Sequence, residues 1–191
     1  MRVLHLVSYP LFSGPMPSTL GLALAQRRRG ADVWLAFDTK RGAFNEFEEA
    51  AAPHLSTLLL EPPLSLTLST KSSAIEWWRD RKALRRLVVD HAVDVVHCHL
   101  SHDHALAALA QLPSSVRIVR TIHSTRSLVP RFGQRWLLRK AHGFIARCET
   151  HRTRLIDLCA LSPERVRVIP GSIDCDALVV PHKADRDSAR E

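Results

Sequence analysis

The sequence predicts an α/β fold in which one doubly wound parallel sheet of about seven strands has helices on both faces. Two observations lead to this fold class. Short runs rich in Val, Ile and Leu alternate with stretches of helical length along the 191 residues, which is typical of right-handed βαβ crossovers. The hydrophobic fraction of 46% is also sufficient to bury one sizeable core. We therefore expect a single domain over residues 1–176, followed by a polar tail over 177–191.

The first part of the chain contains three predicted strands and one predicted helix. In order, they are a strand at 3–8, a helix at 18–29, a strand at 32–37 and a strand at 55–60. Ser18 can cap the helix, because its hydroxyl group can accept a hydrogen bond from a free backbone N–H, and Gly30 can end it. Residues 38–52 and 64–72 have no clear pattern.

From residue 73 onwards, helices and strands alternate regularly. The predicted helices are 73–91, 103–112, 134–142 and 152–161, and the predicted strands are 93–97, 116–122, 144–146 and 166–169. Ser73 and Glu76 have the spacing of a capping box. Ser101 and Thr150 are expected to cap the second and fourth of these helices, and Gly143 to end the third. The complete architecture is Rossmann-like.

The charge of the chain favours an anionic partner. There are 27 Lys and Arg against 19 Asp and Glu, which gives a net charge of +8. Most of the cations are arginines, whose planar groups suit phosphates, although general solubility would account for much of the same charge. The four cysteines form no C-x-x-C pair, and we expect neither a signal peptide nor a membrane span. These features predict a cytoplasmic protein.

Basic segments suggest further partners. The helix at 76–91 and the segment 126–140 are rich in arginine and could contact anionic lipid at the inner face of the membrane, or a phosphorylated acceptor. Trp77, Trp78 and Trp136 could lie at such an interface, although Trp77 falls on the stripe expected to pack on the sheet. We rank nucleic-acid binding low, because the chain has no recognised motif and few aromatic residues. A homodimer is also compatible with the sequence.

In an open parallel sheet, ligands bind beyond the carboxyl ends of the strands, so the loops there are candidate sites. After the first strand, Gly14 allows a ligand to approach the backbone and the next helix offers its N-terminal amides to an anion; a simple tight turn is an equal alternative. After the fourth strand, His97 and His99 would project to the same side. A metal site there has no diagnostic ligand spacing, so we favour one hydrogen-bonding histidine, with structural roles for His102 and His104.

His123 is the histidine that we favour for function. It follows the fifth strand directly and should face the cleft, where an imidazole can accept or relay a proton near neutral pH. Ser124 and Arg126 add hydrogen-bond donors and a fixed positive charge. After the sixth strand, Arg147 and Glu149 precede a helix; Glu149 could bind hydroxyl groups, or the two residues could simply cap the helix. The chain has no nucleophile elbow, P-loop or catalytic triad spacing.

Five segments carry a resemblance to a known family. They are Val3–Gly14, Leu22-Ala-Leu-Ala-Gln-Arg-Arg-Arg-Gly30 with Ala31-Asp32-Val33, Asp94-Val-Val-His-Cys-His99, Thr121-Ile-His-Ser124 and Val168-Ile-Pro-Gly-Ser-Ile-Asp174. In this order they resemble the N-terminal half of a GT-B glycosyltransferase of the retaining family 4, over about residues 1–176. The family's usual Pro-Asn-Gly is Pro170-Gly171-Ser172 here, and the first loop is depleted in glycine.

Such enzymes have two Rossmann-like domains that face a cleft. The resemblance implies that this chain is the domain that binds the acceptor, a sugar or a lipid-linked sugar, whereas a C-terminal domain binds the nucleotide diphosphate sugar that is the donor. It implies that His123 lies at the reacting sugar, that Gly14 lies near the donor phosphate and that 170–174 is the hinge. The other candidates for substrate binding are His99, Ser124, Arg126, Arg147 and Glu149.

The resemblance also implies a reaction without a cofactor or metal ion. Sugar would pass from the nucleotide to a hydroxyl group with retention of configuration, while fixed positive charges and helix dipoles stabilise the leaving diphosphate. We expect the 191 residues to hold only the first of these two domains. We therefore expect the chain alone to be inactive and to need a separate donor-binding chain or domain. The alternative is a non-catalytic α/β module that pairs with a partner chain.

Overall fold

The computed structural model describes residues 1–8, 14–37, 49, 73–128 and 133–171. Within them, six strands form a single parallel sheet. They are β1 (Arg2–Val7), β2 (Asp32–Phe37), β3 (Val95–Cys98), β4 (Arg117–Ile122), β5 (Gly143–Ala146) and β6 (Val166–Val168). Their order across the sheet is β2-β1-β3-β4-β5-β6. The order reverses between β1 and β3, which makes this position the topological switch point of the sheet.

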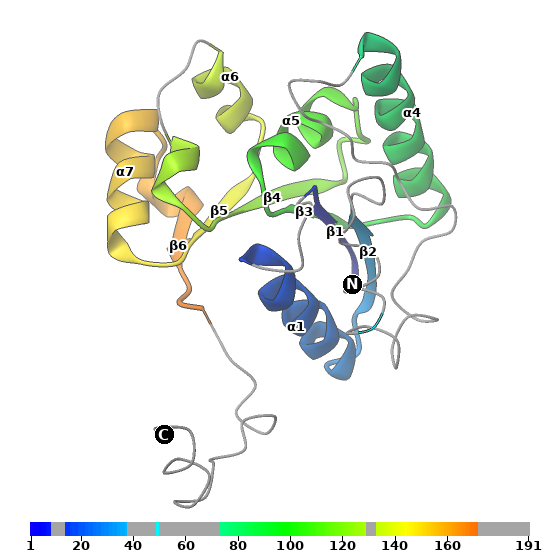
Figure 1. Ribbon diagram of the computed structural model, residues 1–191, viewed down its shortest axis with the longest axis horizontal. Coiled ribbons are helices and arrows are strands. Elements are labelled where there is room, and N and C mark those ends of the chain that lie inside the picture. The colour runs from blue at the N-terminus through cyan, green and yellow to red at the C-terminus, as the bar shows by residue number, and fades with distance from the viewer. Residues whose placement is uncertain (9–13, 38–48, 50–72, 129–132, 172–191) are drawn as a thin grey trace, which may run out of the picture.

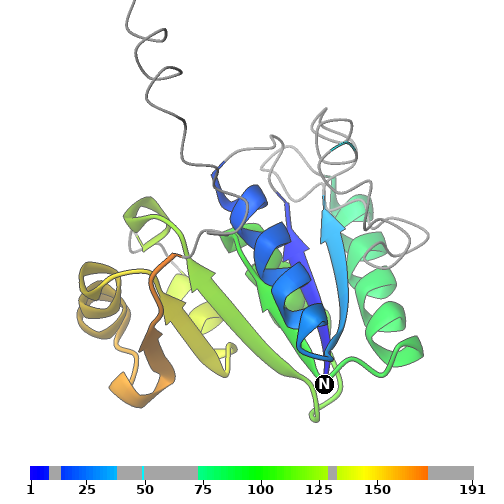
Figure 2. The ribbon, with the colours of Figure 1, turned by 90° about the horizontal axis from the view of Figure 1, so that it is seen from below.

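Helices lie on both faces of the sheet. They are α1 (Pro15–Arg28), α4 (Ala74–Asp90), α5 (Ser101–Leu109), α6 (Gln134–Arg139) and α7 (Glu149–Cys159), with the short 3-10 helices η2 (Thr125–Leu128) and η3 (Pro163–Arg165). Figure 1 shows α1 on one side of the sheet and α4, α5 and α6 on the other, and Figure 2 shows α1 in front of the strands. The predicted α/β class is therefore confirmed.

The alternation of side chains along the strands divides the core into two clusters. The cluster on the α1 face consists of Val3, Val7, Met16, Leu20, Ala23, Val33 and Leu35. The larger cluster on the other face includes Leu4, Leu6, Val96, Ile118, Ile122 and Phe144 from strands, and Leu84, Val88, Leu106, Leu138 and Leu155 from helices. Trp77 packs against the larger cluster, as predicted. The α1 face thus has the smaller core.

The strands predicted from residue 93 onwards and the first two strands are confirmed, with boundaries shifted by at most two residues. The strand predicted at 55–60 and the tail at 177–191 lie outside the described residues, so the count of seven strands stays a prediction. The capping box is present, because the backbone N–H of Glu76 donates to Oγ of Ser73 and the backbone N–H of Ser73 donates to Oε2 of Glu76. Gly30, with φ of 82°, follows the end of α1.

Three predicted caps are wrong. Helix α1 begins at Pro15 after Gly14, because proline already has the backbone angle of a first helical residue; Ser18 lies inside the helix and its hydroxyl donates to the carbonyl of Pro15. Ser101 and Thr150 also lie inside their helices, which begin at Ser101 itself and at Glu149.

The predicted end of one helix is wrong as well. Gly143 does not end α6, which stops at Arg139; it is the first residue of β5. The strand takes this glycine because residue 143 is the register partner of Val119 on β4, so pairing in the sheet decides its conformation.

Among the described residues, no helix combines the length and the apolar character needed to cross a bilayer. Two of the tryptophans considered for an interface are exposed: Trp78 on α4 is 55% exposed and Trp136 on α6 is 52% exposed. In each case a lysine lies over the ring, Lys82 over Trp78 at 3.7 Å and Lys140 over Trp136 at 5.1 Å.

Candidate functional site

Four histidines lie together at the switch point of the sheet. His5 is on β1 and is the register partner of His97 on β3. His99 follows β3 directly and His123 follows β4 directly. The first three are buried and His123 is half-buried. The parallel strands β1, β3 and β4, which follow one another in the sheet, thus bring together side chains as distant in the sequence as His5 and His123.

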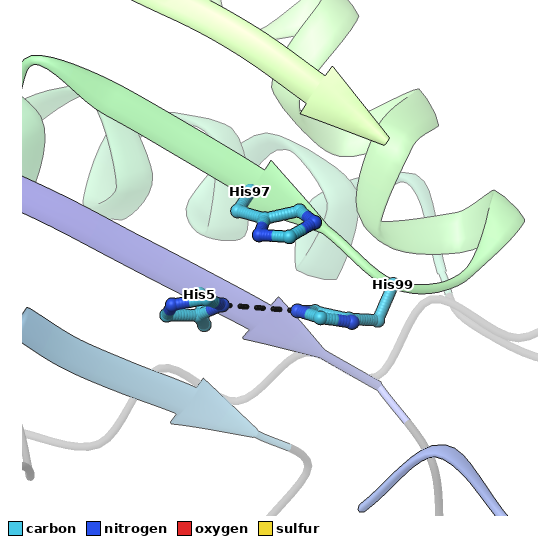
Figure 3. A group of neighbouring side chains, drawn as sticks. All are labelled: His5, His97 and His99. Atoms are coloured by element: carbon cyan, nitrogen blue, oxygen red, sulfur yellow. Dashed lines mark hydrogen bonds between the residues drawn. The ribbon is translucent and has the colours of Figure 1, made fainter. Parts of the chain in front are cut away.

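Hydrogen bonds connect three of these rings in a line. Nδ1 of His5 lies 3.0 Å from Nε2 of His99 (Figure 3), and Nδ1 of His99 lies 3.2 Å from Nε2 of His123. At one end of the line, Nε2 of His5 lies 2.8 Å from Oε1 of Gln26 on α1. At the other end, a terminal guanidinium nitrogen of Arg147 lies 3.5 Å from Nδ1 of His123.

His97 packs on this line without joining it. Its ring stacks on His99 with the ring centroids 4.3 Å apart, and Figure 3 shows it lying over His5 and His99. Its Nε2 lies 2.7 Å from the hydroxyl oxygen of Thr121 on β4. His97 therefore fixes the positions of its neighbours by contact and is itself held by Thr121.

Asp103, in the first turn of α5, fixes the backbone at the carboxyl ends of β1 and β3. Its fully buried carboxylate accepts hydrogen bonds from the backbone N–H groups of Ser8 at 2.9 Å, of His99 at 3.2 Å and of Leu100 at 2.7 Å. This carboxylate performs the capping that was predicted for Ser101, whose hydroxyl instead accepts a hydrogen bond from Arg120. The position of His99 thus depends on Asp103.

Burial keeps the imidazoles of the site neutral. It lowers the pKa of His5 from 6.5 to about 4 and, together with the charges of Arg147 and His151, lowers the pKa of His123 to about 4. Burial and the neighbouring histidines hold the pKa values of His97 and His99 well below their usual range. At neutral pH each ring therefore has one nitrogen that donates and one that accepts.

A pocket of about 380 Å³ lies beside α1, on the face of the sheet that α1 covers, and its floor is formed by β3, β4 and β5. Its apolar wall includes Leu22, Val95, Val119 and Ile145, and its polar end includes Thr19, His97, His99, Thr121, His123, Arg147 and Gly171. Among the described residues that line it, Arg147 is the only Lys or Arg. The pocket is thus an apolar groove with imidazoles and one cation at the carboxyl ends of the strands.

Arg147 lies against Gly171, three residues after the end of β6. A Cβ atom on residue 171 would overlap Nη2 of Arg147. The guanidinium group therefore occupies the space that a side chain at residue 171 would need.

The structure places three of the predicted site residues in the pocket: His99, His123 and Arg147. As far as the described residues define it, the pocket is not lined by Gly14, Ser124, Arg126 or Glu149. Glu149 is exposed and lies 3.7 Å from Arg152 in an ion pair of the first turn of α7, while Oγ of Ser124 accepts a hydrogen bond from the backbone N–H of Arg126. The functional roles predicted for these residues stay predictions.

His5, Gln26 and Thr19 belong to the site but were not among the predicted residues. His5 stands in the middle of a buried apolar strand, which is an unusual place for an unpaired imidazole and could have indicated a partner across the sheet. Gln26 was not recognised from the sequence, because it lies near the basic end of a helix. His104, predicted as a satisfied structural histidine, is buried, but within the described residues its Nε2 has no hydrogen-bond partner.

Within the described part of the chain, the residues that could hold a metal ion are His5, His97 and His99, which each offer a nitrogen within 4.8 Å of the others. Transition metals such as Zn²⁺ bind neutral imidazole. However, both ring nitrogens of His5 and both of His99 already lie within hydrogen-bond distance of another side chain. An ion would have to replace these contacts.

Comparison with known proteins gives one family and several similar structures. The sequence profile of Glycosyltransferase Family 4 matches residues 17–177. A glycosyltransferase from Rickettsia africae ESF-5 is similar over 99% of this chain and 48% of its own, at 16% identity and a TM-score of 0.75. Anabaena Alr3699/HepE, solved in complex with UDP-glucose, is similar over 100% of this chain and 49% of its own, at 16% identity and a TM-score of 0.70.

A UDP-GlcNAc 2-epimerase from Neisseria meningitidis, solved bound to UDP-GlcNAc, is similar over 88% of this chain and 45% of its own, at 15% identity and a TM-score of 0.62. At such low identities, these similarities show the fold alone. The chain spans about half the length of these structures and has the fold of one Rossmann-like domain of a GT-B protein. No curated protein matches the chain significantly.

Proposed function

This chain belongs to Glycosyltransferase Family 4, and from that premise we propose that it is the acceptor-side half of a retaining glycosyltransferase that uses a nucleotide diphosphate sugar. The observation that carries the proposal is the meeting of His99, His123 and Arg147 in one pocket at the carboxyl ends of the strands. In an open α/β sheet this is where ligands bind. The acceptor would be a sugar or a lipid-linked sugar, and no cofactor or metal ion would be needed.

His123 suits recognition of a hydroxyl group better than removal of its proton. A general base works best with a pKa near the working pH, whereas the pKa of His123 is lowered to about 4. A neutral imidazole can still accept or donate a hydrogen bond. We therefore propose that His123 orients the reacting hydroxyl group, and that the proton leaves to another acceptor, such as the leaving diphosphate.

The charge of the pocket supports a separate site for the donor. A nucleotide diphosphate carries at least two negative charges, and catalysis needs preorganised donors and cations where that charge develops. Arg147 alone provides a positive side chain among the described lining residues. We propose that a donor-binding half, on the same polypeptide or on another chain, provides the remaining groups.

The 191-residue chain should therefore not transfer sugar by itself. Purified protein is incubated with UDP- and GDP-sugars and an alkyl glycoside as acceptor probe, and the release of UDP or GDP is measured. We expect no turnover above the rate of the buffer. After addition of a donor-binding half, turnover should appear, and His123→Ala should reduce it at least about 100-fold, the usual effect of losing a positioned polar group.

The control is His102→Ala, which removes an exposed histidine outside the pocket and should leave the reconstituted rate unchanged. Rapid turnover by the isolated chain would show that the proposed dependence on a second half is wrong. A reconstituted His123→Ala enzyme with the parental rate would remove His123 from the site.

We also propose that the outer face of α4 contacts anionic lipid. Ile75, Trp78 and Val89 are each more than half exposed on this helix, and Lys82 and Arg86 lie among them, which is the pattern of a helix at a membrane surface. The protein should pellet with vesicles that contain phosphatidylglycerol and not with phosphatidylcholine alone, and salt should weaken the binding. Failure to pellet at every salt concentration would exclude this contact.

A further inference from the structure

The line of imidazoles has two ends whose hydrogen-bonding roles are fixed. An arginine side chain can only donate, so at the 3.5 Å contact Nδ1 of His123 must be the acceptor. The carbonyl oxygen Oε1 of Gln26 can only accept, so at the 2.8 Å contact Nε2 of His5 must carry the hydrogen. The line is therefore bounded by a donor at one end and by an acceptor at the other.

These two ends determine the tautomer of every ring between them. A neutral imidazole has one N–H and one lone pair. Because Nδ1 of His123 accepts, its Nε2 carries the hydrogen and donates to Nδ1 of His99 at 3.2 Å. Nε2 of His99 then donates to Nδ1 of His5 at 3.0 Å. All three rings thus have the hydrogen on Nε2, which satisfies both the donor at Arg147 and the acceptor at Gln26.

The opposite polarity fits less well. It would place the lone pair of His5 Nε2 against Oε1 of Gln26 at 2.8 Å and an N–H of His123 against the guanidinium of Arg147. One contact would favour it, because an N–H at Nδ1 of His99 could donate to Oγ1 of Thr19 at 3.1 Å. That hydroxyl is flexible, however, and its hydrogen can point to the carbonyl of Pro15 at 2.8 Å or to His99. The opposite polarity is therefore disfavoured, because it makes the contacts at Gln26 and Arg147 repulsive and gains only a contact to Thr19, whose hydroxyl can also donate to His99.

We propose that His99, His5 and Gln26 are positioning residues that hold His123 as the tautomer with hydrogen on Nε2, so that Nδ1 of His123 is kept as an acceptor for a hydroxyl group of the bound substrate. The contact between Nδ1 and Arg147 is the longest in the line and lies at its more exposed end. A substrate hydroxyl can therefore replace the guanidinium there without disturbing the buried part of the line.

The tautomer of His123 adds detail to the proposed function, and the part that His123 plays in binding the substrate rests on that function. A lone pair at Nδ1 selects a group that donates a hydrogen bond, which a sugar hydroxyl does and an ionised phosphate oxygen does not. In the same pocket, the cation of Arg147 suits an anionic oxygen. His123 and Arg147 are adjacent but complementary, so the pair would bind a hydroxyl group and an anionic group that are neighbours in one ligand.

The tautomers can be measured directly in the complete 191-residue protein. Histidines are labelled with ¹⁵N, and long-range proton–nitrogen correlation at about pH 7.5 identifies which nitrogen of each ring carries the hydrogen. We expect His5, His99 and His123 to have it on Nε2. A hydrogen on Nδ1 of His99 or of His123 would overturn the proposal.

Variants at the two ends test whether the line acts as a unit. Gln26→Leu removes the terminal acceptor and should lower the ratio of the Nε2–H to the Nδ1–H form of His123 about tenfold, the value of one hydrogen bond. Gln26→Glu keeps an acceptor and should keep the ratio. Gly171→Ala displaces the guanidinium of Arg147 and should lower the ratio from the other end. Gly21→Ala on α1, whose added Cβ has no neighbour within 4 Å, is the matched control.

The readout separates this proposal from the glycosyltransferase assignment, because it requires neither sugar nor turnover. Unchanged tautomers of His123 in both Gln26→Leu and Gly171→Ala would reject the line even if the enzyme transfers sugar. Zinc ions alone are added as a final arm, and we expect no change in the spectra of the three rings. Stoichiometric loss of their N–H signals on addition of zinc would instead identify a metal site and overturn the proposal.

Discussion

Acidification from pH 7.5 to about pH 4.5 should reduce the free energy of unfolding by at least about 5 kcal/mol, enough to unfold a domain of ordinary stability. The cause is the group of buried histidines. Burial lowers the pKa of His5 to about 4 and, with the charge of Arg120, that of His104 to about 3, from 6.5 in each case. The folded state holds these rings neutral, whereas the unfolded chain binds protons readily below pH 6.5.

The direction of each pKa shift determines whether acid raises or lowers the free energy of unfolding. A histidine with a lowered pKa stabilises the fold fully above pH 6.5 and loses this contribution as the pH falls toward its folded pKa, and for His5 the contribution is about 3 kcal/mol. Asp103 acts in the opposite sense: burial raises its pKa from 3.8 to about 6, so protonation between these values favours the folded state. One carboxyl group offsets only one of the several histidines, and the net effect is destabilisation by acid.

Urea unfolding at a series of pH values measures the effect. His104→Leu should make the midpoint less dependent on pH, because one buried ring no longer binds a proton on unfolding. The control is Ala105→Leu on the same helix, which adds a leucine without removing a titratable group and should leave the dependence as it is. A midpoint that stays constant between pH 7.5 and 4.5 would contradict the burial of neutral histidines.

Removal of the Asp103 carboxylate should have the second large effect. Asp103→Ala leaves three backbone N–H groups without their acceptor, the buried groups of Ser8 and His99 and the partly buried group of Leu100. Each unsatisfied group costs about 1–3 kcal/mol, so we expect a loss of about 3–5 kcal/mol in the free energy of unfolding. Asp103→Asn keeps one of the two oxygens and should lose about half as much.

Glu149→Ala is the matched control, because Glu149 is also an acidic residue in the first turn of a helix but is exposed. Its single ion pair with Arg152 should contribute at most about 1 kcal/mol. Equal urea midpoints for Asp103→Ala and the parent protein would show that the carboxylate does not hold these loops together.

The sequence predicted the sheet better than the helix ends. Runs such as Val95–Cys98 and Gly143–Ala146 are recognisable because the strands of a parallel sheet that is covered on both faces are mostly apolar. Helix starts depend on local competition that spacing does not reveal. Ser101 has the right residue type for a cap, but Asp103 two residues later accepts the free N–H groups because its carboxylate is buried against them.

The site was only partly predictable for a related reason. The ends of parallel strands meet at one edge, so His99, His123 and Arg147 could be expected to lie together, and they line one pocket. His5 could not be placed from the strand pattern alone, because its role depends on the register that sets it beside His97. Glu149 was a candidate for its position after a strand, yet the turn directs it into solvent.

The close approach of Gly171 to Arg147 has a consequence for evolution. A side chain at residue 171, such as the asparagine of the pattern Pro-Asn-Gly, would displace the guanidinium, which is the flexible end of a long side chain. Lineages with a side chain at residue 171 should consequently hold the arginine in another conformation or carry a shorter residue in its place.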